Sequence, residues 1–169
     1  MRLLTLCCFA TLGCAAPLFG YPPPGFGPPG FGSSNTSATN QVKVVIKENY
    51  RYIYSNGIPD HQPGRFPNRN NPNTIRPQQY EFRVTMEPKA TRNPTPVSHS
   101  PFGVASNGVV FDAATAEFWN RNRSSGWNYE AKSGKINLGL DQSNAHVQPT
   151  GSYHYHGLPT GLIQKQGKV

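Results

Sequence analysis

Two histidines near the end of the chain have a spacing that suits metal binding. Residues 151–157 read GSYHYHG, so His154 and His156 are two positions apart and each follows a tyrosine. In an extended strand, residues i and i+2 point to the same face, so the two imidazoles project together and the two tyrosines project oppositely. Because imidazole is a common ligand of divalent transition metals, the spacing predicts a pair of metal ligands on one strand face.

A third histidine, His146, can join this pair if the intervening loop has three residues. Residues 149–151 read PTG, in which proline suits the first turn position and glycine suits the left-handed position that closes the loop. Counting outward pairs Gln148 with Ser152 and His146 with His154, which places three imidazoles on one face. A loop of two or four residues would move His146 to the tyrosine face, because a shift of one residue reverses the side chains that meet.

Three neutral imidazoles without a thiolate predict a Cu(II) or Zn(II) site at His146, His154 and His156. With an open fourth position, such a set also resembles a hydrolytic zinc site, where the metal-bound water is the nucleophile. The alternative is a half-buried strand whose histidines hydrogen-bond to their neighbours. The other histidines, His61 and His99, lie in loops and are either surface residues or a fourth ligand, for which His61 beside Asp60 is the better candidate.

The sequence shows no known hydrolase motif. It contains no Gly-x-Ser-x-Gly elbow, no phosphate-binding glycine loop and no His-Glu-x-x-His motif, and its carboxylates are few and scattered. Since no acid–base partner accompanies the histidines, we expect metal binding or storage rather than catalysis. If the protein is an enzyme, the class that remains is a metal-assisted hydrolase or oxidase.

The elements that position these residues are expected to be strands. Val42, Val44 and Ile46 alternate with polar residues, and Tyr50, Tyr52 and Tyr54 continue on the same parity, which predicts a long half-buried strand or a strand pair. Residues 80–86 alternate in the same way. Shorter candidates are residues 102–105, 109–111, 136–140, 145–147 and 152–156. The pattern predicts one mainly β domain over residues 41–162, built of antiparallel strands as a sandwich-like fold or an open barrel.

One short helix is expected near residues 112–119. Asp112 can cap the backbone amides that follow it, and the alanines of the segment favour helix, although it spans barely two turns. We expect this helix to pack Phe118 and Trp119 inward. Residues 163–169 are expected to form a polar tail.

Residues 1–16 have the layout of a secretory signal peptide, with Arg2, an apolar run and small residues before Pro17. All three cysteines lie inside this segment, so the mature chain would have no disulfide and no thiolate metal site. The alternative is a lipoprotein signal with Cys14 as the lipidated residue. We therefore expect a secreted protein, and no later run is long and apolar enough to span a membrane.

Residues 17–40 are expected to be a disordered linker. The motif PPGFG occurs twice in succession within this Pro/Gly/Ser-rich segment, whose composition buries too little apolar surface to offset the entropy of ordering. The alternative is an adhesive extracellular-matrix tract. Asn35 and Asn122 each begin an N-glycosylation motif.

A net charge of +8 and a pI near 9.6 indicate an anionic partner. Export argues against nucleic acid, which leaves acidic polysaccharide or extracellular matrix as the partner of a non-catalytic protein, or else an ordinary solvated basic surface. The arginines available for such contacts are Arg65, Arg69, Arg76, Arg83, Arg92, Arg121 and Arg123.

Several motifs resemble the YHYH domain family, which takes its name from the tetrad at residues 153–156. The resemblance lies mainly in residues 138–159, LGLDQSNAHVQPTGSYHYHGLP, and covers roughly residues 41–162. Supporting motifs are NGIPDH at 56–61, NGV at 107–109, EFW at 117–119 and WNYE at 127–130. The resemblance implies an exported domain without an established activity. It also implies a continuation into an Asp-Gly-Phe-Pro-Ile-Tyr type of motif, so we expect the domain to be truncated at its C-terminus.

Overall fold

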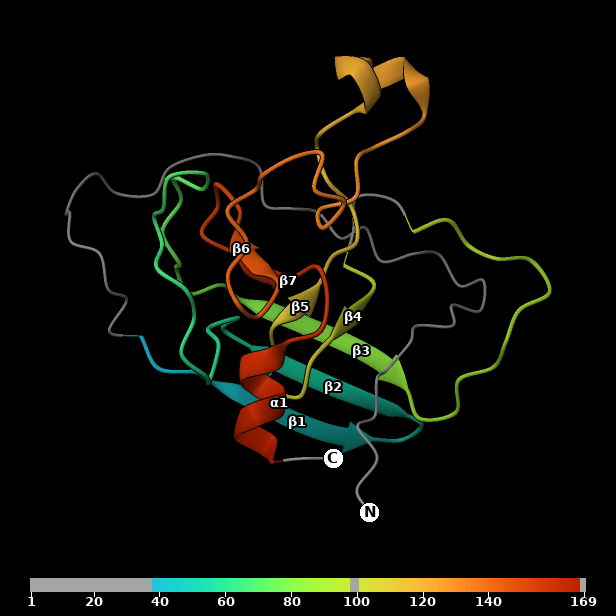
Figure 1. Cartoon of the computed structure of the whole chain (residues 1–169). Coiled ribbons are helices and arrows are strands. Elements are labelled where there is room, and N and C mark those ends of the chain that lie inside the picture. Colours follow the sequence, from blue (N-terminus) through green and yellow to red (C-terminus); the bar gives the residue numbers. More distant parts are fainter. Residues whose placement is uncertain (1–37, 98–100, 168–169) are drawn as a thin grey trace.

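The computed structural model of the chain describes residues 38–97 and 101–167 (Figure 1). The predicted signal peptide, the linker up to residue 37, Asn35 and His99 lie outside the described residues. The described part is mainly β, as predicted, with a three-stranded sheet, a four-stranded sheet and one short α-helix, and neither sheet closes into a barrel. No helix among these residues has the length and apolar character needed to cross a membrane.

The first sheet is an antiparallel meander of β1 (Val42–Lys47), β2 (Tyr50–Ser55) and β3 (Tyr80–Thr85). A two-residue turn joins β1 to β2 and pairs Lys47 with Tyr50, so Val44 lies opposite Ile53 rather than beside a tyrosine of β2. The predicted strand pair is therefore confirmed, with residues of opposite parity sharing a face. A turn with an even number of residues brings residues of opposite parity to the same face.

The second sheet has the order β4-β5-β7-β6 and carries the predicted histidines. Its strands are β4 (Gly103–Val104), β5 (Val110–Phe111), β6 (Ala145–Val147) and β7 (Tyr153–Tyr155). Its four strands form the two antiparallel pairs β4–β5 and β6–β7, and β5 and β7 run parallel. The hairpin β6–β7 thus joins the rest of the sheet through β7, which lies between β5 and β6.

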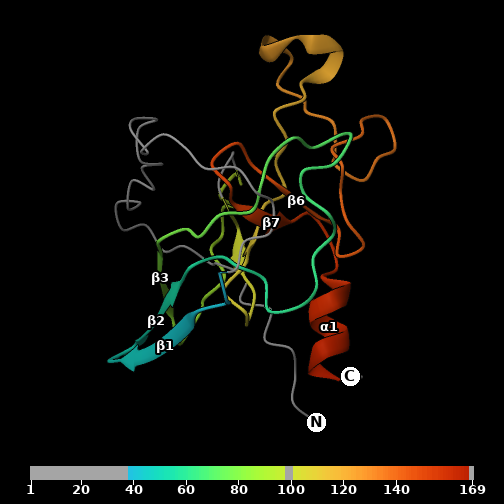
Figure 2. The same ribbon diagram turned by 90° about the vertical axis from the view of Figure 1, so that its left-hand side faces the viewer.

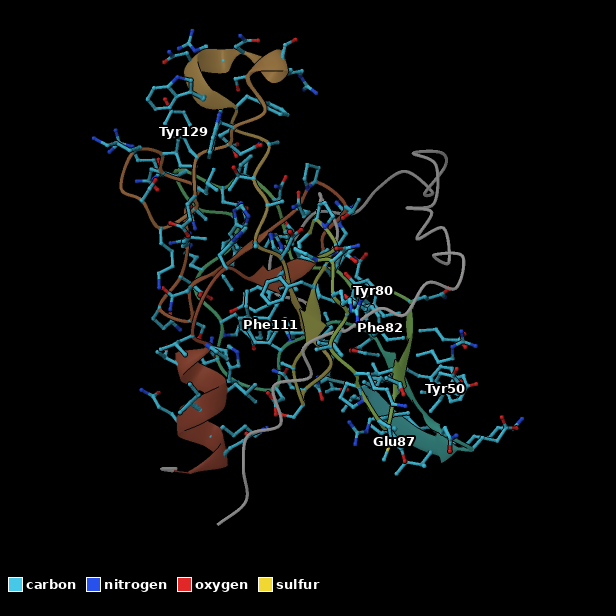
Figure 3. The ribbon with its side chains drawn as sticks, turned by 90° about the vertical axis from the view of Figure 1, so that its right-hand side faces the viewer. Tyr50, Tyr80, Phe82, Glu87, Phe111 and Tyr129 are labelled. Atoms are coloured by element: carbon cyan, nitrogen blue, oxygen red, sulfur yellow. The ribbon has the colours of Figure 1, made fainter. Side chains whose placement is uncertain are left out.

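The two sheets meet through one face of the first. Ile53, Phe82 and Val84 pack against Val104 and Val110 of the second sheet. Figure 3 shows Tyr80 and Phe82 directed toward the body of the molecule and Tyr50 directed away from it. A second apolar cluster lies beyond β5 and contains the rings of both β7 tyrosines. Its buried members are Ile58, Phe66, Ile75, Val109, Phe111, Ala145, Val147, Tyr153 and Tyr155.

The helix predicted near residues 112–119 is absent, and that prediction is wrong in position. Asp112 donates its backbone N–H to Tyr155 and accepts from Ala114 in a local turn, which continues the sheet instead of starting a helix. Farther on, Glu117 and Trp119 pair with residues 127–129. Trp119 is 51% exposed and does not pack inward as expected. The hydrogen bonds to residues 127–129 outweigh the weak helix propensity of a two-turn segment.

The only α-helix of the described residues, α1 (Thr160–Gln166), covers most of the segment expected to be a polar tail. Its one buried residue is Leu162, and Lys165 forms an ion pair of 3.1 Å with Asp60. The last linker residues also belong to the fold, because the Asn40 amide donates to the carbonyls of Ile58 and Asn107.

Residues 117–129 form a projection that we call the arm. Its two sides are joined by an isolated bridge between Phe118 and Asn128, and its tip contains the short 3₁₀ turns η1 (Trp119–Arg121) and η2 (Arg123–Ser125). The arm extends away from both sheets at the top of Figure 1 and Figure 2.

Candidate metal site

The β6–β7 hairpin has the predicted three-residue loop. His146 lies opposite His154 and Val147 lies opposite Tyr153. Gly151 has φ 91° and donates to the carbonyl of Gln148, whose own N–H donates to Ser152. The loop prediction is therefore confirmed, and it places His146, His154 and His156 on one face, as the counting required.

The three imidazoles converge through their Nε2 atoms. Nε2 of His156 lies 3.0 Å from Nε2 of His154 and 3.1 Å from Nε2 of His146. One ligand nitrogen from each residue lies within 4.8 Å of the others, so the cluster could hold a metal ion. No carboxylate or cysteine among the described residues joins this group.

Backbone carbonyls fix the tautomers of two of these histidines. Nδ1 of His146 is 2.9 Å from the carbonyl oxygen of Leu138, and Nδ1 of His154 is 3.2 Å from that of Ser152. A carbonyl oxygen can only accept, so both Nδ1 atoms carry the proton and donate it. Each Nε2 then presents a bare lone pair to the cluster, which is the form that binds a metal.

His156 completes the set. Its Nε2 lies between two lone pairs, so in the metal-free protein this atom carries the proton and donates to its neighbours. Its Nδ1 is buried and has no hydrogen-bond partner within the described part of the chain. Binding of a cation would require this proton to move from Nε2 to Nδ1, so that all three Nε2 lone pairs point at the ion.

Burial keeps the cluster neutral. Desolvation lowers the pKa of His146, and it lowers the pKa of His154 well below its ordinary value with help from the two neighbouring imidazoles. For His156, desolvation and the charge of His146 lower the pKa to about 4. At neutral pH the three rings are therefore uncharged, each with a single proton. A metal ion then does not have to displace a second proton from a cationic ring.

Asn71, which sequence reasoning missed, positions His146. This buried amide donates to the carbonyl of Val147 at 3.0 Å and to that of Leu138 at 3.4 Å, and its nitrogen lies 3.2 Å from Nδ1 of His146. It therefore holds both the strand that carries His146 and the carbonyl that orients the ring. In the sequence, the asparagine-rich run at residues 68–73 indicates only a turn. Nothing in its neighbouring residues predicts a contact with β6.

His61 lies on the other face of β7 and does not join the cluster. Its Nε2 is 2.7 Å from the hydroxyl of Tyr155, and its ring stacks on that of Tyr155 with centroids 6.0 Å apart. Since the β7 tyrosines project away from the histidine face, a residue bound to Tyr155 is on the wrong side to be a fourth ligand. His61 instead takes part in the hydrogen bonds that hold the tyrosine face.

The tyrosine face is filled by protein groups. Tyr153 donates to Asp141 at 2.7 Å, and the hydroxyl of Tyr155 accepts from Asn107 at 3.0 Å. Asp141 also accepts from the backbone N–H groups of Gly64, Ser143 and Ala145. Burial raises the pKa of both tyrosines, so neither phenol ionises at neutral pH.

A surface hollow of about 400 Å³ borders the histidine cluster. Gln148 lines it, and the amide nitrogen of this residue is 3.5 Å from Nε2 of His154. Other lining residues come from the base of the arm and from the β6–β7 loop, among them Asp112, Thr115, Phe118, Arg123 and Pro149. Gln148 thus lines the hollow and also lies beside His154.

Of the two predicted glycosylation sites, Asn122 lies exposed near the tip of the arm. Its side-chain oxygen accepts from the backbone N–H of Ser124 at 2.9 Å. An exposed position in a turn suits a glycan acceptor, and Asn122 stays a prediction as a modified residue.

Comparison with known proteins finds one match. The family model described as "YHYH protein" matches residues 81–169, more than half of the chain, and this range includes the arm, both strands of the histidine hairpin and α1. Neither the curated proteins nor the solved structures contain a match.

Proposed function

The chain belongs to the YHYH protein family, and we propose that it binds a divalent transition metal, Cu(II) or Zn(II), through His146, His154 and His156. The observation that carries the proposal is the pair of fixed tautomers. Leu138 and Ser152 hold the protons of His146 and His154 on Nδ1, so two Nε2 lone pairs point at one position beside a third imidazole. Orientation of a ligand histidine by a backbone carbonyl is a general property of metal sites.

The spacing of the nitrogens suits an ion. Tetrahedral zinc with bonds of about 2.0–2.1 Å separates its nitrogen ligands by about 3.3 Å. The two Nε2 separations of 3.0 and 3.1 Å need to widen only slightly to reach this value. A ligand set made only of imidazole suits both Zn(II) and Cu(II) and does not select one of them.

We propose binding or storage of the metal rather than catalysis. The amide of Gln148 is the polar side chain nearest to the ligand atoms on the solvent side, and an amide is neither an acid nor a base at neutral pH. If the fourth position holds water, Gln148 orients it, and a metal-assisted hydrolase or oxidase is the catalytic alternative. The signal-peptide pattern of residues 1–16 supports secretion as part of the proposal.

Metal analysis of the purified full-length chain tests this function. The protein is stripped with a chelator, exposed to Zn(II) or Cu(II), freed of excess metal and analysed by mass spectrometry of the metal content. We expect about one equivalent per chain, lost in a His154→Ala/His156→Ala variant. His61→Gln is the matched control, because His61 lies on the other face of β7 and its loss leaves the ligands in place.

Circular dichroism of every variant separates loss of the site from loss of the fold. If the His154→Ala/His156→Ala variant is folded and takes up as much metal as the wild type, the proposal is wrong. Wild-type protein that takes up no metal also overturns it.

A further inference from the structure

The arm, residues 117–129, carries the most exposed tryptophan of the described chain. Trp127 is 73% exposed and Trp119 is 51% exposed, which is unusual for the largest apolar side chain. Neither residue belongs to the histidine cluster or to either apolar core. Their exposure therefore calls for a function of the arm itself.

The backbone of the arm places three aromatic rings on one face. The N–H of Trp119 donates to Trp127, the N–H of Tyr129 donates to Glu117, and Phe118 bridges Asn128. In this antiparallel register Trp119 lies opposite Trp127, and directly opposed residues share a face. The rings of Trp119 and Tyr129 are 5.5 Å apart. We call Trp119, Trp127 and Tyr129 the aromatic face, and Figure 3 labels Tyr129 at the base of the arm.

The aromatic face is held in place before any ligand binds. The Thr115 hydroxyl donates to the carbonyl of Tyr129, and the Asn128 amide donates to that of Thr115, both at 2.6 Å. On the opposite face, the guanidinium of Arg123 lies 5.1 Å from the centre of the Phe118 ring. These contacts fix both sides of the arm at its base, so ligand binding does not have to order it.

Arg121 and Arg123 are both exposed near the tip of the arm, and residues 118–129 contain no acidic residue. Glu117, at the base of the arm, lies opposite Tyr129. The aromatic rings thus lie on a projection whose tip carries two cations, of which Arg123 packs on Phe118. Such a surface complements a ligand that has an apolar ring face and carries negative charge.

Two other occupants fit the arm less well. A stable contact with a second copy needs about 800 Å² per partner, whereas two indoles and a phenol supply about 150–250 Å² each at most. A membrane would first meet the tip, and residues 120–125 at the tip read NRNRSS, which is too polar to enter an apolar layer.

We propose that the aromatic face of the arm binds acidic polysaccharide. The apolar C–H faces of successive sugar rings stack on Trp127 and Trp119, and the carboxylate or sulfate groups of the chain pair with Arg121 and Arg123. A single-stranded nucleic acid also has flat rings, but it carries one phosphate per base, and two arginines neutralise few of those charges. This proposal goes beyond metal binding and does not depend on it.

Affinity electrophoresis of the full chain in gels containing heparin or polygalacturonate tests the proposal. The protein is produced without N-linked glycans, because Asn122 lies beside both arginines. We expect Trp119→Ala/Trp127→Ala to weaken retention by roughly tenfold or more, since each aromatic contact contributes to binding. Arg121→Gln/Arg123→Gln should weaken it too and flatten its dependence on salt.

The first sheet offers matched controls. Tyr52→Ala/Tyr54→Ala removes two aromatic rings of β2, and Lys43→Gln/Lys47→Gln removes two exposed cations of β1. Both control variants should bind as the wild type does, and unchanged circular dichroism shows that the arm variants are folded.

Four results would overturn the proposal. The first three are unchanged retention of Trp119→Ala/Trp127→Ala, equal retention of the wild type by neutral dextran, and tighter binding to oligo(dT) than to either acidic polysaccharide. A wild-type protein that neither acidic gel retains would do the same.

Discussion

The two faces of β7 are both largely buried but differ in what satisfies their polar groups. On one face, the hydroxyls of Tyr153 and Tyr155 bond to Asp141, Asn107 and His61, all of them protein side chains. On the other face, the Nε2 atoms of the histidines face one another, and the one other group near them is the Gln148 amide, 3.5 Å from His154. Burial alone therefore does not separate a structural residue from a candidate ligand.

The difference indicates what each face contributes. A tyrosine that donates to a protein acceptor contributes to folding whether or not an ion is present. Three imidazoles whose inward nitrogens share one proton contribute fully only when a cation binds there and that proton moves to Nδ1 of His156. Substitutions on the tyrosine face should thus cost stability under all conditions, whereas substitutions on the histidine face should cost stability mainly when metal is present.

The largest effect is expected from Tyr155→Ala. This change removes a ring that is 0% exposed and one hydrogen-bond partner each of Asn107 and His61, so we expect a loss of about 3–5 kcal/mol in the free energy of unfolding. Urea denaturation with and without zinc measures it, and the loss should be the same in both. Tyr54→Ala, on the exposed face of β2, serves as the control, with a change of about 0.5 kcal/mol or less. If Tyr155→Ala lowered the free energy of unfolding only in the presence of zinc, the two faces would not differ in the way proposed.

Zinc should stabilise the wild type by about 2.7 kcal/mol at a free concentration of 100 times its Kd. The stabilisation follows because the unfolded chain does not hold three imidazoles together. His146→Ala/His156→Ala should show little of this gain, while Tyr155→Phe, which keeps the histidine face, should show all of it. Thermal denaturation at matched zinc concentrations measures the effect. Equal stabilisation of wild type and histidine variant would place the zinc elsewhere.

Acid should destabilise the metal-free protein by about 2 kcal/mol through the histidine face. Burial lowers the pKa of His156 to about 4, below the value of about 6.5 in the unfolded chain. Between these values the unfolded state binds more protons, so the stability present above pH 6.5 is lost as the pH falls toward 4. Urea midpoints at pH 7, 6, 5 and 4 follow the loss. His156→Gln should flatten the slope, and an unchanged slope in that variant would contradict the assignment.

A smaller effect is expected at Asn71, which acts through His146. Asn71→Ala removes the amide that holds the carbonyls of Val147 and Leu138, and zinc affinity should fall by about tenfold because the ring is less well oriented. Competition with a chromophoric chelator measures the affinity. Asn70→Ala changes an exposed neighbour and should leave it unaltered. If both variants bind zinc equally well, Asn71 does not position the site.

Local turn chemistry is what made the histidine face predictable. Pro149 and Gly151 determine a three-residue loop by their own backbone preferences, and the loop alone decides that His146 meets His154. The supports of the site come from far along the chain. Asn71 reaches β6 from 75 residues before His146, and no periodicity or motif records such a contact.

Elements whose structure depends on pairing with another segment were predicted less well. Residues 112–119 have the propensity of a short helix, but Glu117 and Trp119 pair with the other side of the arm. The parity of residues 42–54 predicted a strand or a strand pair, and the two-residue turn at Glu48, with φ 55°, decided which residues of β1 and β2 lie opposite each other. In both places pairing with another segment decided the structure.

X-ray absorption spectroscopy of the zinc-loaded full chain tests the central claim most directly, because it counts the ligands of the bound ion. The account predicts three imidazoles at about 2.0–2.1 Å, with one lighter oxygen ligand, and a spectrum that loses imidazole scattering in His154→Ala/His156→Ala. A zinc ion surrounded by oxygen ligands with one imidazole or none would contradict it, because the ion would then be bound somewhere other than the histidine face of β7.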